Sequence, residues 1–177
     1  MKSVMFMPAL DLKKTFTNTN GFTLLEFIIV FSMCAVLICF TPVFFRAFER
    51  HKLYSAASVI AADLRLAQQL NINQDAVYTV LFDCVNERYL IERNVYTYKK
   101  TNLPGGIDLV FTNFDFDNDS RNGYDNKLRF NIKGEPYRNN GFFNGGHISI
   151  CNKNGEFIYV IVASITGRVR IDTKPPL

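Results

Sequence analysis

Two arginines near the end of the chain have the spacing needed to hold an anion together. The stretch Gly167-Arg168-Val169-Arg170 places them two residues apart, and on a β-strand such residues project from the same face. A guanidinium presents several N–H donors in one plane, so a pair of them can hold a phosphate group. The competing interpretation is structural: both side chains pair with acidic residues or lie in solvent on a terminal strand.

A second basic stretch could extend that surface. Tyr96 and Tyr98 stand just before Lys99 and Lys100. Basic groups interleaved with aromatic rings suit single-stranded nucleic acid, because its bases stack on aromatic side chains. Such alternation is more often that of an amphipathic sheet edge, so the two interpretations stay open.

Three aspartates are spaced like the start of a calcium-binding loop. Asp115, Asp117 and Asp119 alternate along the chain, as the first ligands of an EF-hand do. However, Ser120 stands where the EF-hand requires glycine, and Asn126 stands where it requires a bidentate glutamate. A solvated acidic turn is therefore the expected structure and calcium the weaker alternative. No other metal site and no cofactor is predicted.

The cysteines and histidines give no indication of catalysis. Cys84 and Cys151 lie in the polar part of the chain, and in an oxidising compartment they could form a disulfide. Bridging requires Cα atoms within about 7 Å, which a sequence does not reveal. No serine or cysteine stands with His51 or His147 in a nucleophile–base pattern, so we expect no enzymatic activity.

The elements that position these residues differ sharply in composition. The 177 residues include 20 basic and 16 acidic side chains, and 48% are hydrophobic. These values exclude disorder along the whole chain and an overall polycation. Residues 27–45 contain no charged side chain. At about 1.5 Å per residue this run can cross a bilayer core of ~30 Å, and the absence of a second such run excludes a multi-span protein.

The flanks of the apolar run Phe27 to Phe45 indicate its orientation. Lys13 and Lys14 precede it, so by the positive-inside rule the short N-terminal stretch stays in the cytoplasm and the C-terminal part is exported. A cleaved secretory signal is disfavoured because the run exceeds ~15 residues and no small-x-small site follows. A plain signal anchor is the simple alternative. Against it stands Glu26 at the membrane edge, where a carboxylate is costly and should have a partner.

The residues around Glu26 closely resemble the leader of type IV pilins and type II secretion pseudopilins. The match is Lys13-Lys14 followed by Asn20-Gly21-Phe22-Thr23-Leu24-Leu25-Glu26, directly before the apolar run. The resemblance implies that a prepilin peptidase cuts between Gly21 and Phe22 and methylates Phe22. It also implies that Glu26 pairs with the N-terminal amine of a neighbouring subunit as the filament forms on an inner-membrane assembly platform. The leader is long for that family, so Met5 or Met7 could be the true first residue instead of Met1.

A second resemblance covers the rest of the chain except residues 94–126. The segments that carry it are 62–69, 77–80, 128–134, 146–150, 157–163 and 167–170. They are similar to the GspH/FimT group of minor pseudopilins and minor pilins. This implies a subunit of a short filament for protein secretion, anchored in the inner membrane by one span. In FimT-type minor pilins a motif like that at Arg168 and Arg170 is associated with DNA capture, so DNA uptake is the alternative function.

We therefore expect an α+β chain: a long N-terminal helix packed on an antiparallel β head. Residues 1–21 would be the leader, 22–45 the transmembrane part of the helix, 46–75 its amphipathic continuation and 76–177 the head. The continuation carries one apolar stripe with helical spacing. Its members are Leu53, Ala57, Ile60, Leu64 and Ala67.

The head should contain seven short strands, folded as one strongly bent sheet or as a two-sheet sandwich. The expected strands are residues 76–82, 88–93, 106–111, 127–132, 146–151, 156–163 and 167–171. Asn154-Gly155 separates two apolar runs, which predicts a hairpin with a type I′ turn.

Overall fold

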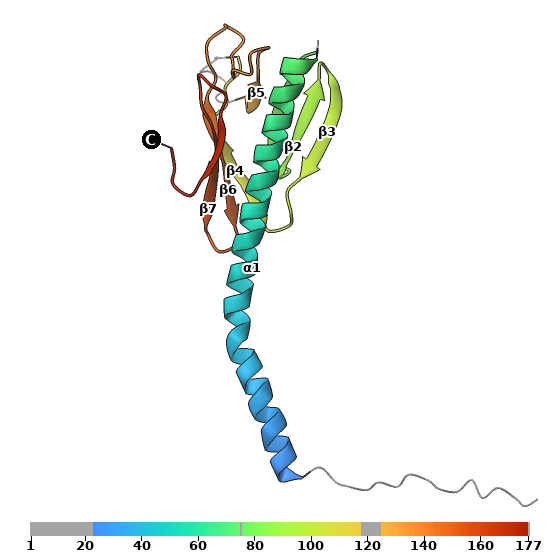
Figure 1. Ribbon diagram of the computed structural model, residues 1–177, viewed down its shortest axis with the longest axis vertical. Coiled ribbons are helices and arrows are strands. Elements are labelled where there is room, and N and C mark those ends of the chain that lie inside the picture. The colour runs from blue at the N-terminus through green and yellow to red at the C-terminus, as the bar shows by residue number, and fades with distance from the viewer. Residues whose placement is uncertain (1–22, 75, 118–124, 177) are drawn as a thin grey trace, which may run out of the picture. The chain divides into compact units, whose positions relative to one another are not determined.

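The computed structural model describes residues 23–74, 76–117 and 125–176, apart from the side chains of residues 40–43 (Figure 1). Within them the chain forms one helix and eight strands. The elements are α1 (Leu24–Asn73), β1 (Tyr78–Asp83), β2 (Arg88–Arg93), β3 (Tyr96–Asn102), β4 (Ile107–Thr112), β5 (Lys127–Arg129), β6 (Gly146–Asn152), β7 (Phe157–Val162) and β8 (Val169–Asp172). The expected α+β fold is confirmed.

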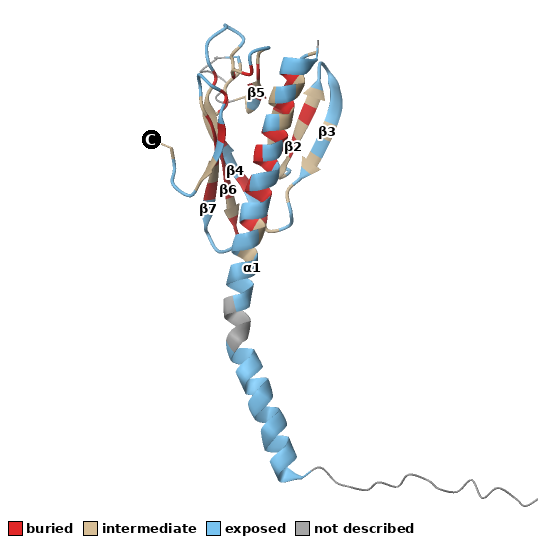
Figure 2. Ribbon diagram, in the orientation of Figure 1, coloured by how far each residue is buried: buried red, intermediate tan, exposed pale blue. Residues whose placement is uncertain are grey.

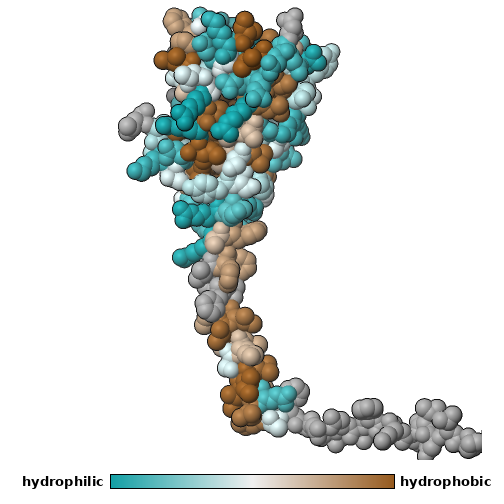
Figure 3. All heavy atoms as spheres, in the orientation of Figure 1, coloured by the Kyte–Doolittle hydropathy of each residue, from teal (hydrophilic) through white to brown (hydrophobic). Residues whose placement is uncertain are grey.

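The chain divides into two compact units, residues 1–41 and 42–177, which are described separately. In the first unit, every described side chain from Leu24 to Cys39 is exposed (Figure 2). Figure 3 shows that the surface of this segment is mainly hydrophobic. By length and composition α1 can cross a membrane, as expected from the uncharged run.

In the second unit, residues 42–177, the rest of α1 packs against two four-stranded antiparallel sheets, and from here on the head means this whole unit. The first sheet has the strand order β3-β2-β1-β5 and the second has the order β4-β6-β7-β8. The predicted helical stripe is confirmed, because all five of its side chains are at most 1% exposed. Both sheets contribute to a single hydrophobic core around this stripe.

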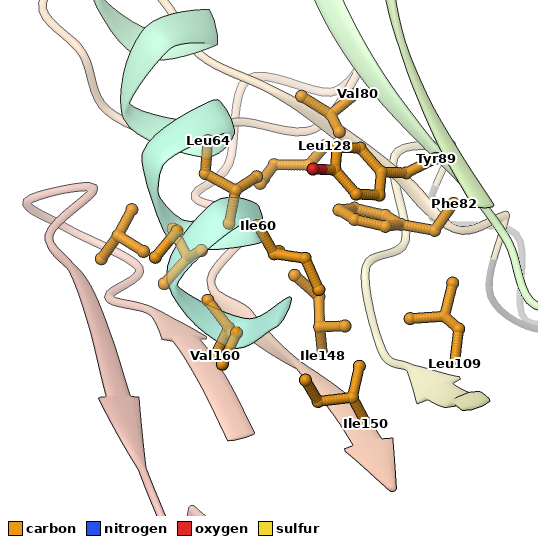
Figure 4. Packing of buried hydrophobic residues seen from close by; sticks show 14 of the residues in the cluster. Ile60, Leu64, Val80, Phe82, Tyr89, Leu109, Leu128, Ile148, Ile150 and Val160 are labelled. Carbon is orange, nitrogen blue, oxygen red and sulfur yellow. The ribbon is translucent and has the colours of Figure 1, made fainter. Parts of the chain in front are cut away.

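The core forms because the strands of both sheets other than β3 turn apolar side chains inward, where residues two apart share one face of a strand. Figure 4 shows Ile60 and Leu64 of α1 between two groups of side chains. The first sheet supplies Val80, Phe82, Tyr89 and Leu128, and the second supplies Ile148, Ile150 and Val160. The head is therefore the two-sheet form of the expected alternatives, with the helix completing its core.

Three local expectations differ from the structure. β3 was not expected, because most of its side chains are polar and exposed. β5 is shorter than expected, because the Asn131 side chain accepts hydrogen bonds from the backbone of Lys133 and Glu135 and turns the chain. The β6–β7 hairpin exists, but only Gly155 in its turn has a positive φ, 76°. That turn is therefore not type I′, which needs a positive φ at two successive residues.

Candidate functional site

The two arginines of the C-terminal motif lie together on the head surface. β8 begins at Val169, which is buried, while Arg168 and Arg170 on either side of it are exposed. Both line one surface cavity of about 660 Å³. The predicted common face of the two side chains is thus present, and it opens onto a space large enough for a ligand.

The charge in this cavity is positive. Its remaining walls come from the start of β6, the end of β7 and the segments beside them: Asn113, Gly145, Gly146, His147, Ile161, Val162, Ala163, Ser164 and Pro176. None of these side chains is acidic. Within the described part of the chain, neither arginine forms an ion pair. The cavity can therefore offer two guanidiniums to an anion.

His147 enters the cavity through strand pairing. Ile161 of β7 lies opposite His147 on one side and opposite Arg170 on the other, so three strands bring these residues to one place. The His147 ring lies 5.8 Å from the Phe111 ring and 5.9 Å from the Tyr159 ring. Burial lowers the pKa of His147 below its ordinary value. At neutral pH the charge of the cavity therefore comes from the arginines.

Gly167, the first residue of the motif, has a structural role. Its φ is 63°, and a Cβ at this position would collide with the backbone oxygen of Gly134. The Gln68 side chain of α1 donates hydrogen bonds to the carbonyls of Gly134 and Gly167 at 2.6 and 3.3 Å. Arg65 donates to the carbonyl of Val169 at 3.0 Å. The helix thus fixes the start of β8, and only glycine fits where two loops meet.

The tyrosine–lysine stretch does not extend the arginine cavity. It forms β3, an edge strand of the other sheet, and none of its residues lines the cavity. Lys99 forms an ion pair with Asp63 at 2.6 Å, and Tyr98 packs edge-on against Tyr78. The two stretches belong to different sheets and do not line one cavity.

The structure describes only two of the three aspartates of the calcium hypothesis. Asp119 lies outside the described residues, while Asp115 and Asp117 lie inside them. Within the described ranges, no group of three His, Cys, Asp or Glu side chains gathers that could hold a metal. Asp125 accepts hydrogen bonds from the backbone N–H groups of Phe116 and Lys127 at 2.9 and 3.2 Å, so its carboxylate stabilises the local backbone.

The disulfide considered for Cys84 and Cys151 is absent: both are free thiols. Cys84 follows β1 of the first sheet, whereas Cys151 lies on β6 of the second sheet. Burial raises the pKa of each thiol. Both therefore stay protonated at neutral pH, which also disfavours them as nucleophiles.

At the other end of the chain, Gly21 and Phe22 lie outside the described residues. Glu26 lies in the first turn of α1 and its backbone N–H donates to Oγ1 of Thr23 at 3.3 Å. Thr-x-x-Glu is the pattern of a helix capping box, and a carboxylate is favoured at this helix end. Sequence reasoning sought a partner for Glu26 in another subunit and missed this role within its own helix.

Comparison with known proteins identifies the fold. No protein-family model and no curated protein matches the chain. Among solved structures, it matches the minor pseudopilin EpsH from the type 2 secretion system of Vibrio cholerae with 16% identity and a TM-score of 0.50, over 68% of this chain and 95% of that chain. It matches the type IV minor pilin FimU of Pseudomonas aeruginosa with 15% identity and a TM-score of 0.52, over 72% and 95% of the two chains. The chain therefore has the fold of minor pseudopilins and minor pilins.

Proposed function

We propose that this chain is a minor subunit of the type IV filament superfamily. It is made as a precursor, cut between Gly21 and Phe22 by a prepilin peptidase, and held in the inner membrane by residues 22–45 with its head exported. Other pseudopilins or pilins and an assembly platform are then its partners in a filament. The chain acts through assembly and not through catalysis.

The observation that carries this proposal is the combination of two features in one helix. The N-terminal part of α1 exposes only apolar and small side chains apart from Glu26, and the C-terminal part is built into the core of the head. An exposed apolar helix needs a membrane or neighbouring helices to cover it. The leader-like residues 20–26 stand at the start of this helix, and the fold of the head is that of minor filament subunits.

Between the possible machines, we favour a type II secretion system. The closing segments resemble the GspH/FimT group, which includes the minor pseudopilins of secretion systems, and the fold agrees equally with a pilus subunit. The function proposed first is therefore a minor pseudopilin of a short secretion filament.

The processing step has a direct test. We expect the protein recovered from its native membrane to begin at methylated Phe22, read by mass spectrometry of the N-terminal peptide. The variant Gly21→Glu should abolish cleavage, because a charged side chain replaces the small residue at the cut, and it should keep the mass of the precursor. A mature N-terminus upstream of Phe22 would contradict the proposal.

A second function, DNA binding during uptake, is favoured by one specific observation. Arg168 and Arg170 line the same cavity, no acidic side chain lines it with them, and neither forms an ion pair in the described chain. That arrangement suits the phosphates of a DNA backbone. We keep it as the alternative function of this subunit, with the same assembly steps.

DNA binding can be tested by salt titration of the fragment 46–177, which contains the whole hydrophobic core. We expect Arg168→Gln with Arg170→Gln to weaken binding to single-stranded DNA at least tenfold in low salt. Losing two phosphate contacts should reduce the slope of log affinity against log salt by about 1.4. The matched control, Arg93→Gln with Lys100→Gln, also removes two exposed positive charges but lies in the other sheet. Equal losses in both double variants would show non-specific attraction, and no binding by the parent fragment would remove this function.

A further inference from the structure

A second basic cavity lies on the head beside the end of the apolar run. It has a volume of about 490 Å³ and is lined by Arg46, Ala47, Arg50, His51, Tyr54 and Glu156. Arg46, Arg50 and Tyr54 follow one another at intervals of four residues along α1, so they share one face of the helix. Glu156, just before β7, completes the lining.

The position of this cavity along the helix matches the headgroup layer of a membrane. Arg46 directly follows the last residue of the uncharged run. At about 1.5 Å per residue, Arg50 lies only ~8 Å further along the axis than Phe45, and the headgroup layer is ~5–7 Å thick on each side. Side chains of an α-helix lean toward its N-terminus. Those of Arg50 and Tyr54 therefore lean back toward the apolar run.

The charges around the cavity leave an excess of positive charge. Within the described residues, Arg46 and Arg50 form no ion pair, while the nearby Glu49 is 4.0 Å from Lys52. Glu156 is the acidic side chain of the lining, and its carboxylate accepts a hydrogen bond from Asn152 at 2.8 Å. Two arginines against one glutamate give a net charge of +1. A ligand with one negative charge would balance the cavity.

We infer that this cavity binds the phosphate of an anionic phospholipid headgroup, such as phosphatidylglycerol. Arg46 and Arg50 hold the phosphate oxygens through charge-assisted hydrogen bonds. Tyr54, which lines the same cavity and is 41% exposed, is suited to the membrane interface, where tyrosine is enriched. The inference rests on the proposed function, because it requires α1 to span a membrane. It adds a lipid ligand that fixes the depth of the subunit in the bilayer.

The test uses the full chain in detergent micelles that contain equal amounts of phosphatidylglycerol and phosphatidylcholine, with bound lipids counted by native mass spectrometry. We expect the parent protein to retain phosphatidylglycerol about tenfold over phosphatidylcholine, in line with the attraction of two basic residues near an anionic surface. Arg46→Gln with Arg50→Gln should reduce this ratio to near one. Arg93→Gln with Lys100→Gln removes the same charge from β2 and β3, which do not line this cavity, and should leave the ratio unchanged. Glu156→Gln, which removes the opposing charge, should raise it.

Three results would overturn the inference. The first is an equal lipid ratio in the parent protein and in the Arg46, Arg50 double variant. The second is competition by millimolar inorganic phosphate, which would identify a site for free phosphate. The third is a ratio near one for the parent protein, as expected if the arginines serve an acidic surface of another protein. Flotation with vesicles separates failure of the headgroup site from failure of the proposed function. A chain that floats with vesicles but shows no lipid preference contradicts only the headgroup site. A chain that does not float contradicts the proposed function as well.

Discussion

Glu26→Gln is expected to leave cleavage of the precursor intact and to reduce incorporation into filaments at least tenfold. Glutamine occupies nearly the same volume and can still serve a helix capping box. It cannot neutralise the ammonium group that cleavage would create at Phe22. Removing one member of a desolvated ion pair typically costs about 3–5 kcal/mol, and each 1.36 kcal/mol is a factor of ten. The effect should remain large even if the pair is partly hydrated.

The structure supplies the control that separates the two roles of Glu26. Thr23→Ala removes the hydroxyl that accepts the hydrogen bond from the Glu26 backbone but leaves the carboxylate in place. It should cost about 1 kcal/mol of helix stability and leave incorporation near normal. Incorporation is measured by cross-linking subunits in membranes and counting the filament-bound fraction. If Thr23→Ala is as defective as Glu26→Gln, or if Glu26→Gln assembles normally, the ion-pair argument is wrong.

Much of the fold could be predicted because its strongest signals are local. The uncharged run and the helical stripe are patterns within a single element, and the structure confirms the stripe residue by residue. β3 was missed for the converse reason. It is an edge strand with few apolar side chains, and none of the side chains from Tyr96 to Asn102 is buried. Its sequence therefore lacks the alternation of apolar and polar residues that predicts a strand.

For the candidate sites, the sequence predicts only the relations between residues that are close together in the chain. Arg168 and Arg170 share a face because they are two residues apart on a strand, which the spacing already indicates. The presence of His147 in the same cavity depends on the pairing of β6, β7 and β8. Such register is set by contacts between distant segments. Likewise, nothing in the sequence around Gly167 distinguishes it from an ordinary turn glycine. Its close contact with the backbone of Gly134 depends on the folded positions of both loops.

The least predictable feature is a buried carboxylate in the C-terminal part of the helix. Asp63 is 6% exposed and lies within a stretch that by spacing alone could face solvent. It accepts hydrogen bonds from the hydroxyl of Tyr89 at 2.7 Å, from Nζ of Lys99 at 2.6 Å and from Oγ1 of Thr101 at 3.4 Å. Burial and the bond to Asp63 raise the pKa of Tyr89, so this hydroxyl remains a donor at any physiological pH. Through these bonds, α1 holds both β2 and the edge strand β3.

Asp63→Ala should therefore destabilise the head by about 2–4 kcal/mol, which is a large part of the 5–15 kcal/mol typical of a domain. The buried Tyr89 hydroxyl would lose its acceptor and Lys99 its counter-charge, and an unsatisfied buried polar group costs about 1–3 kcal/mol by itself. The measurement is urea denaturation of the fragment 46–177.

The control for this prediction is a second close ion pair of the head, Asp83 with Arg88. Its atoms are 2.8 Å apart, but its side chains are 25% and 32% exposed, so water replaces the lost partner. Asp83→Ala should therefore lose clearly less stability than Asp63→Ala. Hydrogen exchange adds a local readout, because Asp63→Ala should speed exchange in β3 before it does so in β7, whose residues Ile158, Val160 and Val162 belong to the hydrophobic core. Equal losses in the two variants, with uniform exchange, would mean that β3 is held by strand pairing with β2 and that the buried carboxylate contributes little.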